Sequence, residues 1–382
     1  MRFALKVVIV FMILLPSMLI GQESIKILTY NLEGMKPGTN PGLRIALIIS
    51  ELKIINPDII ALQEINEDIS GDGSDNQGLL IKNALSAYFQ TEYYYYEQQT
   101  HLSWDNEFKE FVGIISKYPV NDKGYFQLVT GVFPRKVVWN RVSTPIGDIN
   151  IFNTHLSFNS SAVRLEQVEQ VDNYINSIST NNGIINNILC GDLNSTPTST
   201  VIEFITDPSS EIYYHSSFKK ANLGLPGYTV PSNNPNAKID YVFYTSNSKL
   251  SVDTSYIVMD EPLGEDFYNS DHLGILSIFS IGDNTGIDKL QSINSKPFKL
   301  YPNYPNPCTS YTSIDFEIFD NKHIKMLLFN QQGAYVNTLL NQVKKPGRHN
   351  VKINFDELKD NIYFFVIEVD GYTETKKIVV LH

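Results

Sequence analysis

Only two cysteines occur in the chain of 382 residues, Cys190 and Cys308, and they lie in different parts of the sequence. Two separated cysteines do not indicate a disulfide framework, which argues against a small cross-linked scaffold. Hydrophobic residues make up 42% of the chain and charged residues 19%. This composition argues against a disordered chain and predicts a globular protein of two or three domains with a sizeable core.

Long apolar runs are also scarce, because only the N-terminus has one. Arg2 and Lys6 give this segment a basic start, and the apolar run from Val7 to Leu15 follows. The layout predicts a secretory signal peptide over residues 1–21, too short to span a membrane well. An uncleaved N-terminal anchor is the alternative. No other run is long enough to cross a bilayer, so we expect no stable membrane insertion of the mature domain.

Positive charge is in short supply, and the deficit is uneven. Residues 23–282 contain 16 Lys and Arg against 30 Asp and Glu, a net charge of −14, whereas residues 283–382 have a net charge of +1. An acidic domain is not expected to bind nucleic acid through a broad basic surface. Its charge remains compatible with a metal-centred site, where carboxylates are the ligands.

Short apolar runs alternate with helical patterns through residues 22–282. A β-prone run at 25–30 is followed by a helical pattern at 42–55, which Asn56-Pro57 ends, and by a second apolar run at 58–65. Further segments complete the pattern: strands are expected at 91–99, 111–120, 147–158, 183–194, 238–245 and 272–280, and a helix at 161–178. The order predicts a layered α/β or α+β sandwich in which helices cover sheets.

The character of the sequence changes after residue 282. Residues 283–296 are polar and small, which predicts a linker. Residues 297–382 contain short alternating runs and turn signals such as Lys345-Pro-Gly347, without a strong helical pattern. We therefore expect a small C-terminal all-β sandwich.

Polar residues that can carry chemistry stand at the ends of many predicted strands. They are Asn31, Glu64, His155, Asp192, Asn194, Asp240, Asp271 and His272. Oxygen ligands from Asn, Asp and Glu suit Mg²⁺, Mn²⁺ or Ca²⁺ better than zinc. Histidines beside carboxylates suit general acid–base chemistry at neutral pH. A metal, a base and an acid at one rim are the parts that hydrolysis of a phosphodiester requires.

The phrases around these residues resemble the endonuclease/exonuclease/phosphatase superfamily, the group of deoxyribonuclease I, exonuclease III and the inositol polyphosphate phosphatases. The resemblance spans about residues 24–281, and its phrases occur in family order: YNLEG, DIIALQEI, GIISKYPV, FNTHLSF, GDLNSTP, KIDYVF and SDHLGI. Any one phrase is weak, but the ordered set is specific. It implies a deoxyribonuclease I-like layered α/β sandwich.

The resemblance also implies a metal site. Glu64 matches the principal metal-binding glutamate, Asn31 an asparagine that helps to position metal and phosphate, and Asp271 an acidic residue near the metal. The implied cofactor is Mg²⁺, with Mn²⁺ or Ca²⁺ as alternatives. Glu110 loosely matches a glutamate that supports the first histidine. His101 stands in no motif, and no role is expected for it.

Five further positions match catalytic residues of the family. His155 matches a histidine near the scissile phosphate, which acts as general acid or phosphate ligand. Asp192 matches the aspartate that orients or deprotonates the attacking water, and Asn194 an asparagine that holds the phosphate. His272 matches the catalytic histidine of the SDH phrase, and Asp240 the aspartate that pairs with it.

The tail resembles the C-terminal sorting domain of the Bacteroidota type IX secretion system. A Tyr-Pro-Asn-Pro phrase at 304–307 and a basic-then-apolar terminal strand, TKKIVVL, carry the resemblance, although Cys308 departs from the usual residue type. A generic immunoglobulin-like or carbohydrate-binding module is the alternative. With the signal peptide, the tail implies secretion to the cell surface or medium, with the secretion machinery as a partner.

Together these features predict a secreted, divalent-metal-dependent phosphoesterase whose substrate is a phosphate ester. A nuclease is the first expectation. A sphingomyelinase- or phosphoinositide-like phosphoesterase is the alternative, although the tryptophan-cysteine-aspartate-arginine phrase of inositol phosphatases is missing at KIDYVF. A non-catalytic surface binding protein on the same scaffold is a further alternative.

Overall fold

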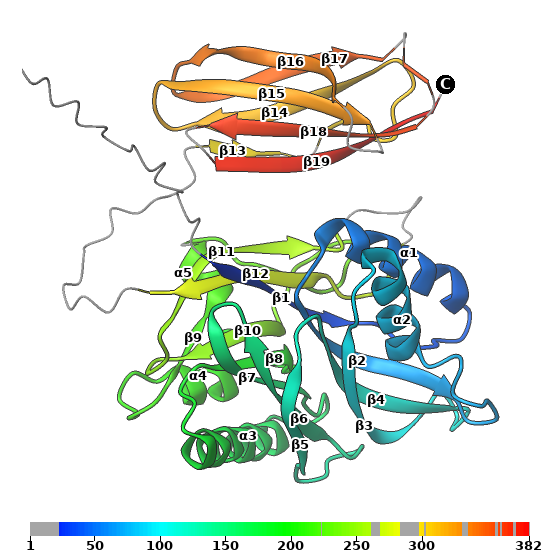
Figure 1. Cartoon of the computed structure of the whole chain (residues 1–382), viewed down its shortest axis with the longest axis vertical. Coiled ribbons are helices and arrows are strands. Elements are labelled where there is room, and N and C mark those ends of the chain that lie inside the picture. The colour runs from blue at the N-terminus through cyan, green and yellow to red at the C-terminus, as the bar shows by residue number, and fades with distance from the viewer. Residues whose placement is uncertain are drawn as a thin grey trace, which may run out of the picture. The chain divides into compact units, whose positions relative to one another are not determined.

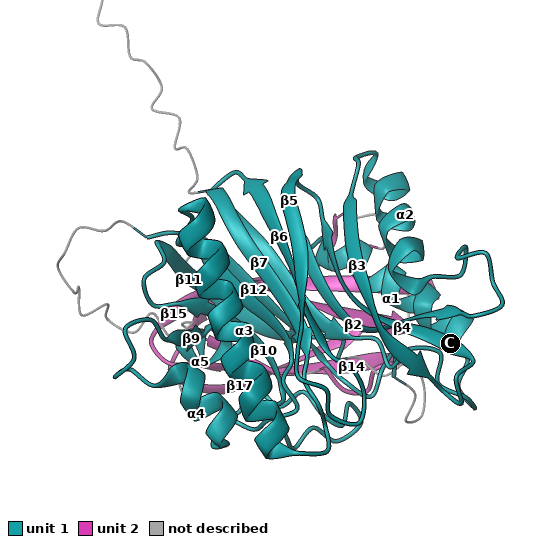
Figure 2. Ribbon diagram, turned by 90° about the horizontal axis from the view of Figure 1, so that it is seen from below, with its two compact units in different colours: residues 1–284 teal, residues 285–382 magenta. Residues whose placement is uncertain are grey.

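The computed structural model forms two compact units, residues 1–284 and 285–382 (Figure 2). It describes residues 23–222, 224–260, 268–282, 298–301, 303–330, 335–355, 358–359, 361–369 and 372–381. The predicted signal peptide and linker lie outside the described residues. Within these ranges, no helix has both the length and the apolar character needed to cross a membrane.

Two six-stranded sheets form the centre of the first unit (Figure 1). One sheet has the order β11-β12-β1-β2-β4-β3, built from β1 (Ser24–Asn31), β2 (Ile59–Asp68), β3 (Tyr94–Ser103), β4 (Phe108–Ser116), β11 (Leu250–Val258) and β12 (Gly274–Ile281). The other has the order β5-β6-β7-β8-β10-β9, built from β5 (Val120–Gln127), β6 (Lys136–Thr144), β7 (Gly147–His155), β8 (Asn187–Asp192), β9 (Tyr214–Ser216) and β10 (Asp240–Thr245).

Apolar side chains from both sheets form one core, which is mainly aliphatic and also encloses buried polar residues such as Gln63 and Asn153. Ile27 and Ile114 from the first sheet belong to the same buried cluster as Ile151 and Val242 from the second. Burial of this kind contributes roughly 25 cal/mol for each Å² of apolar surface. The rims of two packed sheets therefore lie side by side, which positions the site described below.

Helices cover the outer faces of both sheets (Figure 2). Helices α1 (Pro41–Ile55) and α2 (Gln77–Phe89) pack on the first sheet, and α3 (Ser161–Asn182) and α4 (Thr200–Thr206) on the second. A short helix, α5 (Ser217–Ala221), follows β9. The predicted deoxyribonuclease I-like layered sandwich is confirmed.

Capping residues in the sequence explain where the helices begin and end. The Asn40 side chain accepts a hydrogen bond from the Leu43 N–H at the start of α1, and Asn56 adopts a left-handed conformation at its end. Helix α3 begins at the Ser160 cap and ends at Gly183. Both helices lie where the sequence predicts them, apart from a few terminal residues.

Four strands of the first unit, β5, β6, β9 and β11, were not predicted from the sequence. β9 has only 3 residues, too few to form a recognisable pattern. β5 and β11 are the edge strands of their sheets, and much of their surface is exposed or only partly buried, so they lack a strong apolar pattern. β6 is apolar enough to recognise, with Val137 and Val138 fully buried, but it pairs with β7 as a hairpin partner that the sequence reading missed.

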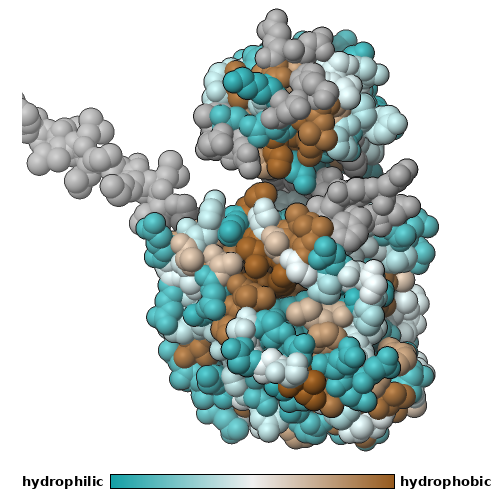
Figure 3. Space-filling view, turned by 90° about the vertical axis from the view of Figure 1, so that its right-hand side faces the viewer, coloured by the Kyte–Doolittle hydropathy of each residue, from teal (hydrophilic) through white to brown (hydrophobic). Residues whose placement is uncertain are grey.

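The surface of the first unit is mixed in character. Figure 3 shows one face on which hydrophobic residues gather among hydrophilic ones. Exposed apolar side chains on the two helices of the first sheet include Leu43 and Ile54 of α1 and Tyr88 of α2. Exposed apolar side chains are common on globular proteins, so their presence here does not by itself indicate a binding site.

The second unit is an all-β sandwich, as predicted. Its sheets have the orders β13-β14-β17 and β16-β15-β18-β19, built from β13 (Phe298–Leu300), β14 (Tyr311–Ile318), β15 (Lys322–Asn330), β16 (Tyr335–Lys344), β17 (Gly347–Asn354), β18 (Asn361–Val369) and β19 (Tyr372–Val380). Alternate residues of β14 are buried, and Phe316, Phe355 and Phe365 belong to one core. Cys308 is buried in the same core.

Candidate active site

The polar strand ends meet because the registers of the two sheets bring them to one rim. In the second sheet, Asp192 lies opposite His155 on one side and opposite Asp240 on the other. In the first sheet, β1 runs parallel to β2, so that Asn31 pairs with Gln63, the residue before Glu64. Strand pairing thus makes neighbours of residues that are distant in sequence within each sheet, and the packing of the two sheets brings both groups together.

Glu64 lies on an irregularity of β2. The register between β2 and β4 shifts between Leu62 and Ile65, and Glu64 has a φ of 52°. Positive φ is uncommon for a residue other than glycine, and such bulges redirect side chains near active sites. The Asn31 Nδ2 donates to Glu64 Oε1 at 3.0 Å and lies 3.2 Å from Asp192 Oδ2, which joins the two sheets.

The bulge is held from the opposite sheet by a buried asparagine. Asn153 Nδ2 donates to the carbonyl oxygen of Leu62 at 2.9 Å and to that of Gly113 at 2.7 Å. Gln63 Nε2 donates to Asn153 Oδ1 at 2.7 Å. Asn153 is fully buried, so these bonds satisfy backbone groups that water does not reach. The sequence analysis did not single out Asn153, although it stands in the FNTHLSF phrase.

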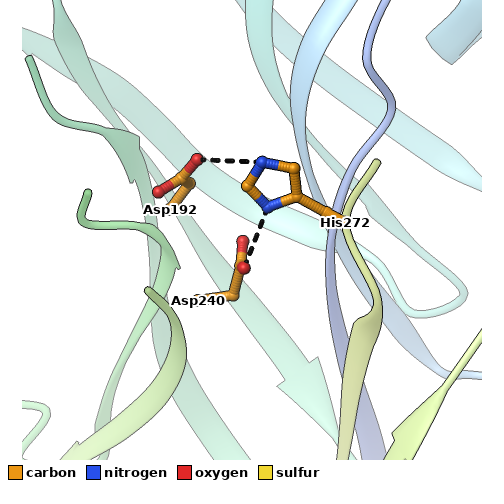
Figure 4. Close-up of side chains that lie close together, drawn as sticks. All are labelled: Asp192, Asp240 and His272. Atoms are coloured by element: carbon orange, nitrogen blue, oxygen red, sulfur yellow. Dashed lines mark hydrogen bonds and ion pairs between the residues drawn. The ribbon is translucent and has the colours of Figure 1, made fainter. Parts of the chain in front are cut away.

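His272 lies between two aspartates (Figure 4). Its Nδ1 donates to Asp240 Oδ2 at 2.9 Å, and its Nε2 is 3.7 Å from Asp192 Oδ2. Burial alone lowers the pKa of His272, but the Asp240 and Asp192 carboxylates outweigh it and raise this pKa well above its ordinary value. The structure therefore brings His272 and Asp240 together as the predicted pair, with the imidazole charged.

Three N–H donors converge on one carboxylate oxygen of Asp192. They come from Asn31 Nδ2 at 3.2 Å, His155 Nε2 at 3.5 Å and His272 Nε2 at 3.7 Å. The other oxygen of Asp192 accepts the backbone N–H of Asn194 at 2.8 Å. Burial and the neighbouring Asp240 carboxylate raise the pKa of Asp192 to about 7. A carboxyl group with such a pKa is suited to proton transfer near neutral pH.

A close approach of two strands explains the glycine in the GDLN phrase. Gly191 has a φ of 146°, and a Cβ there would lie 2.1 Å from the carbonyl oxygen of Thr154. Only glycine fits this backbone. The turn that follows holds Asn194, whose Nδ2 donates to the Leu156 carbonyl oxygen at 3.0 Å and lies 3.1 Å from His155 Nε2.

A buried arginine fixes the state of His155. Arg135 lies 3.1 Å from His155 Nδ1 through one guanidinium nitrogen and 3.3 Å from Glu110 Oε1 through the same nitrogen. A guanidinium only donates, so Nδ1 accepts and the imidazole proton lies on Nε2, the nitrogen that faces Asp192. Burial, followed by the charge of Arg135, lowers the pKa of His155 well below its ordinary value. His155 is therefore neutral and presents an N–H to the site.

Two residues near His155 were missed by the sequence reading. Arg135 stands just before β6, a strand that was not predicted, so no motif drew attention to it. His101 also lies here, 3.6 Å from Glu110 Oε1, with its ring stacked on Phe133. Glu110 contacts Arg135, so the support of His155 expected from Glu110 passes through the guanidinium.

The charge of the site fits a divalent cation. Glu64, Asp192 and Asp240 lie close together, and Asp240 Oδ1 is buried without a hydrogen-bond partner. Donor atoms of Asp192, Asp240 and His272 all lie within 4.8 Å of one another. Burial raises the pKa of Glu64, and Asp271 raises it further, so a bound cation would stabilise the ionised carboxylate. The charge of Arg135 lowers the pKa of Glu64, but Arg135 is also paired with Glu110, so it offsets only part of this negative charge.

Hard oxygen donors of this kind suit Mg²⁺, Mn²⁺ or Ca²⁺. We expect Glu64, Asn31 and Asp271 to hold the ion. Asp271 is the most open of the three, with its side chain 51% exposed and its carboxylate 3.9 Å from His272 Nε2. The bound ion would neutralise charge on phosphoryl oxygens.

A cleft of about 500 Å³ opens beside these residues. Its lining combines catalytic candidates with the aromatic side chains of Trp104, Phe133 and Phe158. The full lining is Glu64, His101, Leu102, Ser103, Trp104, Asp105, Asn106, Glu110, Phe133, Arg135, His155, Phe158, Asp192, Asn194 and His272.

Solved structures of similar fold come from bacteria and humans. An endonuclease/exonuclease/phosphatase family protein from Leptotrichia buccalis matches with a TM-score of 0.55 and 21% identity, over 67% of this chain and 100% of that one. The human Nocturnin catalytic domain with bound sulfate matches with a TM-score of 0.54 and 22% identity, over 68% of this chain and 93% of that one. A mannosyl-6-phosphatase from Bacteroides thetaiotaomicron matches with a TM-score of 0.54 and 18% identity, over 67% of this chain and 100% of that one. These likenesses concern the fold alone.

No match was found among curated protein sequences. Family models match both units of the chain. Residues 302–381 match the secretion system C-terminal sorting domain, which directs export to the cell surface or exterior. Residues 28–272 match the endonuclease/exonuclease/phosphatase family, whose members hydrolyse phosphoester bonds and depend on a divalent metal. The chain belongs to the endonuclease/exonuclease/phosphatase family and ends in a secretion sorting domain.

Proposed function

We propose that the protein is a secreted, divalent-metal-dependent phosphodiesterase that hydrolyses nucleic acid. The observation that carries this proposal is the convergence of N–H groups from Asn31, His155 and His272 on the Asp192 carboxylate. Donors aimed at one point in a buried site can bind the oxygens of a phosphoryl group as its charge develops. The aromatic side chains in the lining of the cleft, Trp104, Phe133 and Phe158, favour a substrate that carries planar bases.

Each residue has a defined part in the proposed reaction. Asp192 orients a water molecule and takes its proton as the oxygen attacks phosphorus. His155 Nε2 and the Asn194 amide donate to the phosphoryl oxygens. His272, charged and held by Asp240, gives its proton to the leaving oxygen when the P–O bond breaks. Water thus supplies one proton to the enzyme, and the enzyme returns one to the departing alcohol.

The test compares the full chain with a His272→Ala variant on supercoiled plasmid DNA and single-stranded RNA, with Mg²⁺, Mn²⁺ or EDTA. Cleavage that requires metal and is lost in the variant supports a nuclease. If both nucleic acids survive while bis(4-nitrophenyl) phosphate is hydrolysed, the chemistry stands and the substrate is a lipid or small phosphate ester. If no ester is hydrolysed, the alternative of a non-catalytic binding protein replaces the proposal.

A further inference from the structure

We propose that Trp104, Phe133 and Phe158 form a binding site for one unpaired base beside the scissile phosphate. We call these three side chains the aromatic cluster. The inference rests on the proposed function and narrows its substrate to single-stranded nucleic acid, strand ends and short nucleotide esters. Duplex DNA is excluded as a good substrate, because its bases are stacked on one another and cannot enter the cleft.

The position of the aromatic cluster ties it to the catalytic residues. All three aromatic residues line the same cleft as His155, Asp192 and His272. Phe158 follows His155 by three residues in the chain, directly after β7. A phosphate bound by the histidines therefore places its attached nucleoside next to these rings.

The rings are presented in a fixed arrangement. Phe133 stacks on His101 with centroids 4.2 Å apart and planes at 19°, and it lies 6.1 Å from Phe158. Trp104 Nε1 donates to Asn66 Oδ1 at 3.1 Å, which holds the indole. The side chain of Phe158 is 56% exposed at the mouth of the cleft. Rings immobilised before binding lose little entropy when a base stacks on them.

The turn that carries Trp104 adopts an unusual backbone. Trp104, Asp105 and Asn106 have φ values of 46°, 58° and 65° between β3 and β4. Three successive non-glycine residues in the left-handed region are costly, and such conformations gather at ligand sites. The turn closes with a hydrogen bond from the Glu107 N–H to the Trp104 carbonyl oxygen at 3.1 Å. The turn therefore fixes the backbone from which the Trp104 side chain reaches the lining of the cleft.

The size and charge of the cleft favour a short, single-stranded ligand. Its volume of about 500 Å³ suits one nucleotide. No lysine is among its lining residues, and its one arginine, Arg135, is buried and paired with Glu110. Proteins that bind duplexes neutralise several phosphates with lysine and arginine. Stacking beside one phosphate binds a base of any identity without such a surface.

The experiment measures steady-state kinetics of the full chain on the dinucleotide TpT and on an analogue with an abasic deoxyribose in place of one thymidine. Phe158→Ala and Trp104→Leu are the test variants. Phe126→Ala is the matched control, because Phe126 is also exposed, on β5, but does not line the cleft. We expect the test variants to raise KM for TpT about tenfold, with kcat within about twofold of wild type. The abasic analogue should show no such change.

A second arm compares a single-stranded 12-mer with the same strand in a duplex, and we expect the single strand to be cleaved at least about tenfold faster. Equal KM values in Phe158→Ala and Phe126→Ala, or equal rates on the two strand forms, overturn the inference while the proposed function stands. If wild type cleaves none of these substrates, the proposed function fails. In that case, tryptophan fluorescence measures the binding of thymidine 5′-phosphate and, for comparison, of deoxyribose 5-phosphate, which tests the base site alone. Weaker binding of thymidine 5′-phosphate to Phe158→Ala than to wild type supports the base site. Unchanged binding refutes the base site.

Discussion

At the scale of the residue, Asp192 has the most contacts with the rest of the site. It meets both histidines and both asparagines of the candidate site, and its Oδ1 is satisfied by the Asn194 backbone. An amide at this position keeps the shape of the carboxylate but cannot take a proton. The substitution of Asp192 by asparagine therefore distinguishes a role in proton transfer from a role in holding the structure of the site.

We predict that Asp192→Asn lowers kcat by about 10²- to 10⁴-fold while KM and the melting temperature change little. The measurement is steady-state hydrolysis of a phosphodiester beside thermal unfolding. Asp207→Asn is the control, because Asp207 is exposed after α4. Normal turnover in Asp192→Asn would exclude Asp192 as the base.

His101 gives a prediction that depends on pH. Burial, followed by the charge of Arg135, lowers its pKa to about 4, whereas a histidine in the unfolded chain titrates near 6.5. As pH falls from 6.5 to 4, the unfolded state binds a proton that the folded state does not, so the free energy of unfolding decreases. His101→Gln removes this contribution.

Between pH 7 and pH 4, we expect the free energy of unfolding to decrease by about 1–3 kcal/mol less in His101→Gln than in wild type. Urea unfolding followed by tryptophan fluorescence measures it, because both tryptophans, Trp104 and Trp139, lie in the first unit. Groups that do not interact with His101 titrate alike in both proteins and cancel in the comparison; His155, whose pKa the charge of His101 lowers, is the exception. Parallel stability profiles would show that His101 is protonated normally in the folded protein.

At the scale of the element, the site depends on one irregular strand. β2 bulges at Glu64, and Asn153 of β7 satisfies the backbone carbonyls of Leu62 and Gly113 around the bulge. Without that amide, the carbonyl groups of Leu62 and Gly113 lose the donor that reaches them from the opposite sheet, and we expect the Glu64 carboxylate to lose its fixed direction.

We predict that Asn153→Leu lowers the free energy of unfolding by about 2–4 kcal/mol and weakens Mn²⁺ binding about 10- to 100-fold. Isothermal titration of Mn²⁺ and urea unfolding measure the two effects. Asn181→Leu, at an exposed position near the end of α3, is the control. A loss of stability with unchanged metal affinity would show that Asn153 does not position Glu64.

Elements also show how far the sequence leads. The strands that end in polar residues were predictable, because each apolar run and the polar residues after it stand next to one another in the sequence. The edge strands β5 and β11 were not, since a strand with an exposed face carries no strong apolar signal. Arg135 and His101 come close to the site only when the strands pair. A contact of this kind leaves no pattern in the local sequence, so it could not be predicted.

At the scale of the whole molecule, the first unit concentrates buried negative charge at one rim. Glu64, Asp192 and Asp240 approach one another, and the pKa values of Glu64 and Asp192 are raised by burial. A cation that binds only the folded state relieves this repulsion and stabilises the unit.

We predict that Mg²⁺ or Mn²⁺ at roughly 100 times its Kd raises the melting temperature of the first unit by about 5–10 °C, and that EDTA reverses the shift. Glu64→Ala should abolish the shift. Differential scanning calorimetry of the full chain measures it. A shift that persists in Glu64→Ala would place the bound ion elsewhere.

Each unit contains one buried free thiol, Cys190 in the first and Cys308 in the second. Neither side chain reaches solvent while its unit is folded, and burial raises both thiol pKa values. A thiol reagent therefore labels each cysteine only when its own unit opens. The natural sequence thus carries two built-in reporters, and the rates at which they react, resolved by peptide mass, give the opening of each unit separately and without an introduced probe.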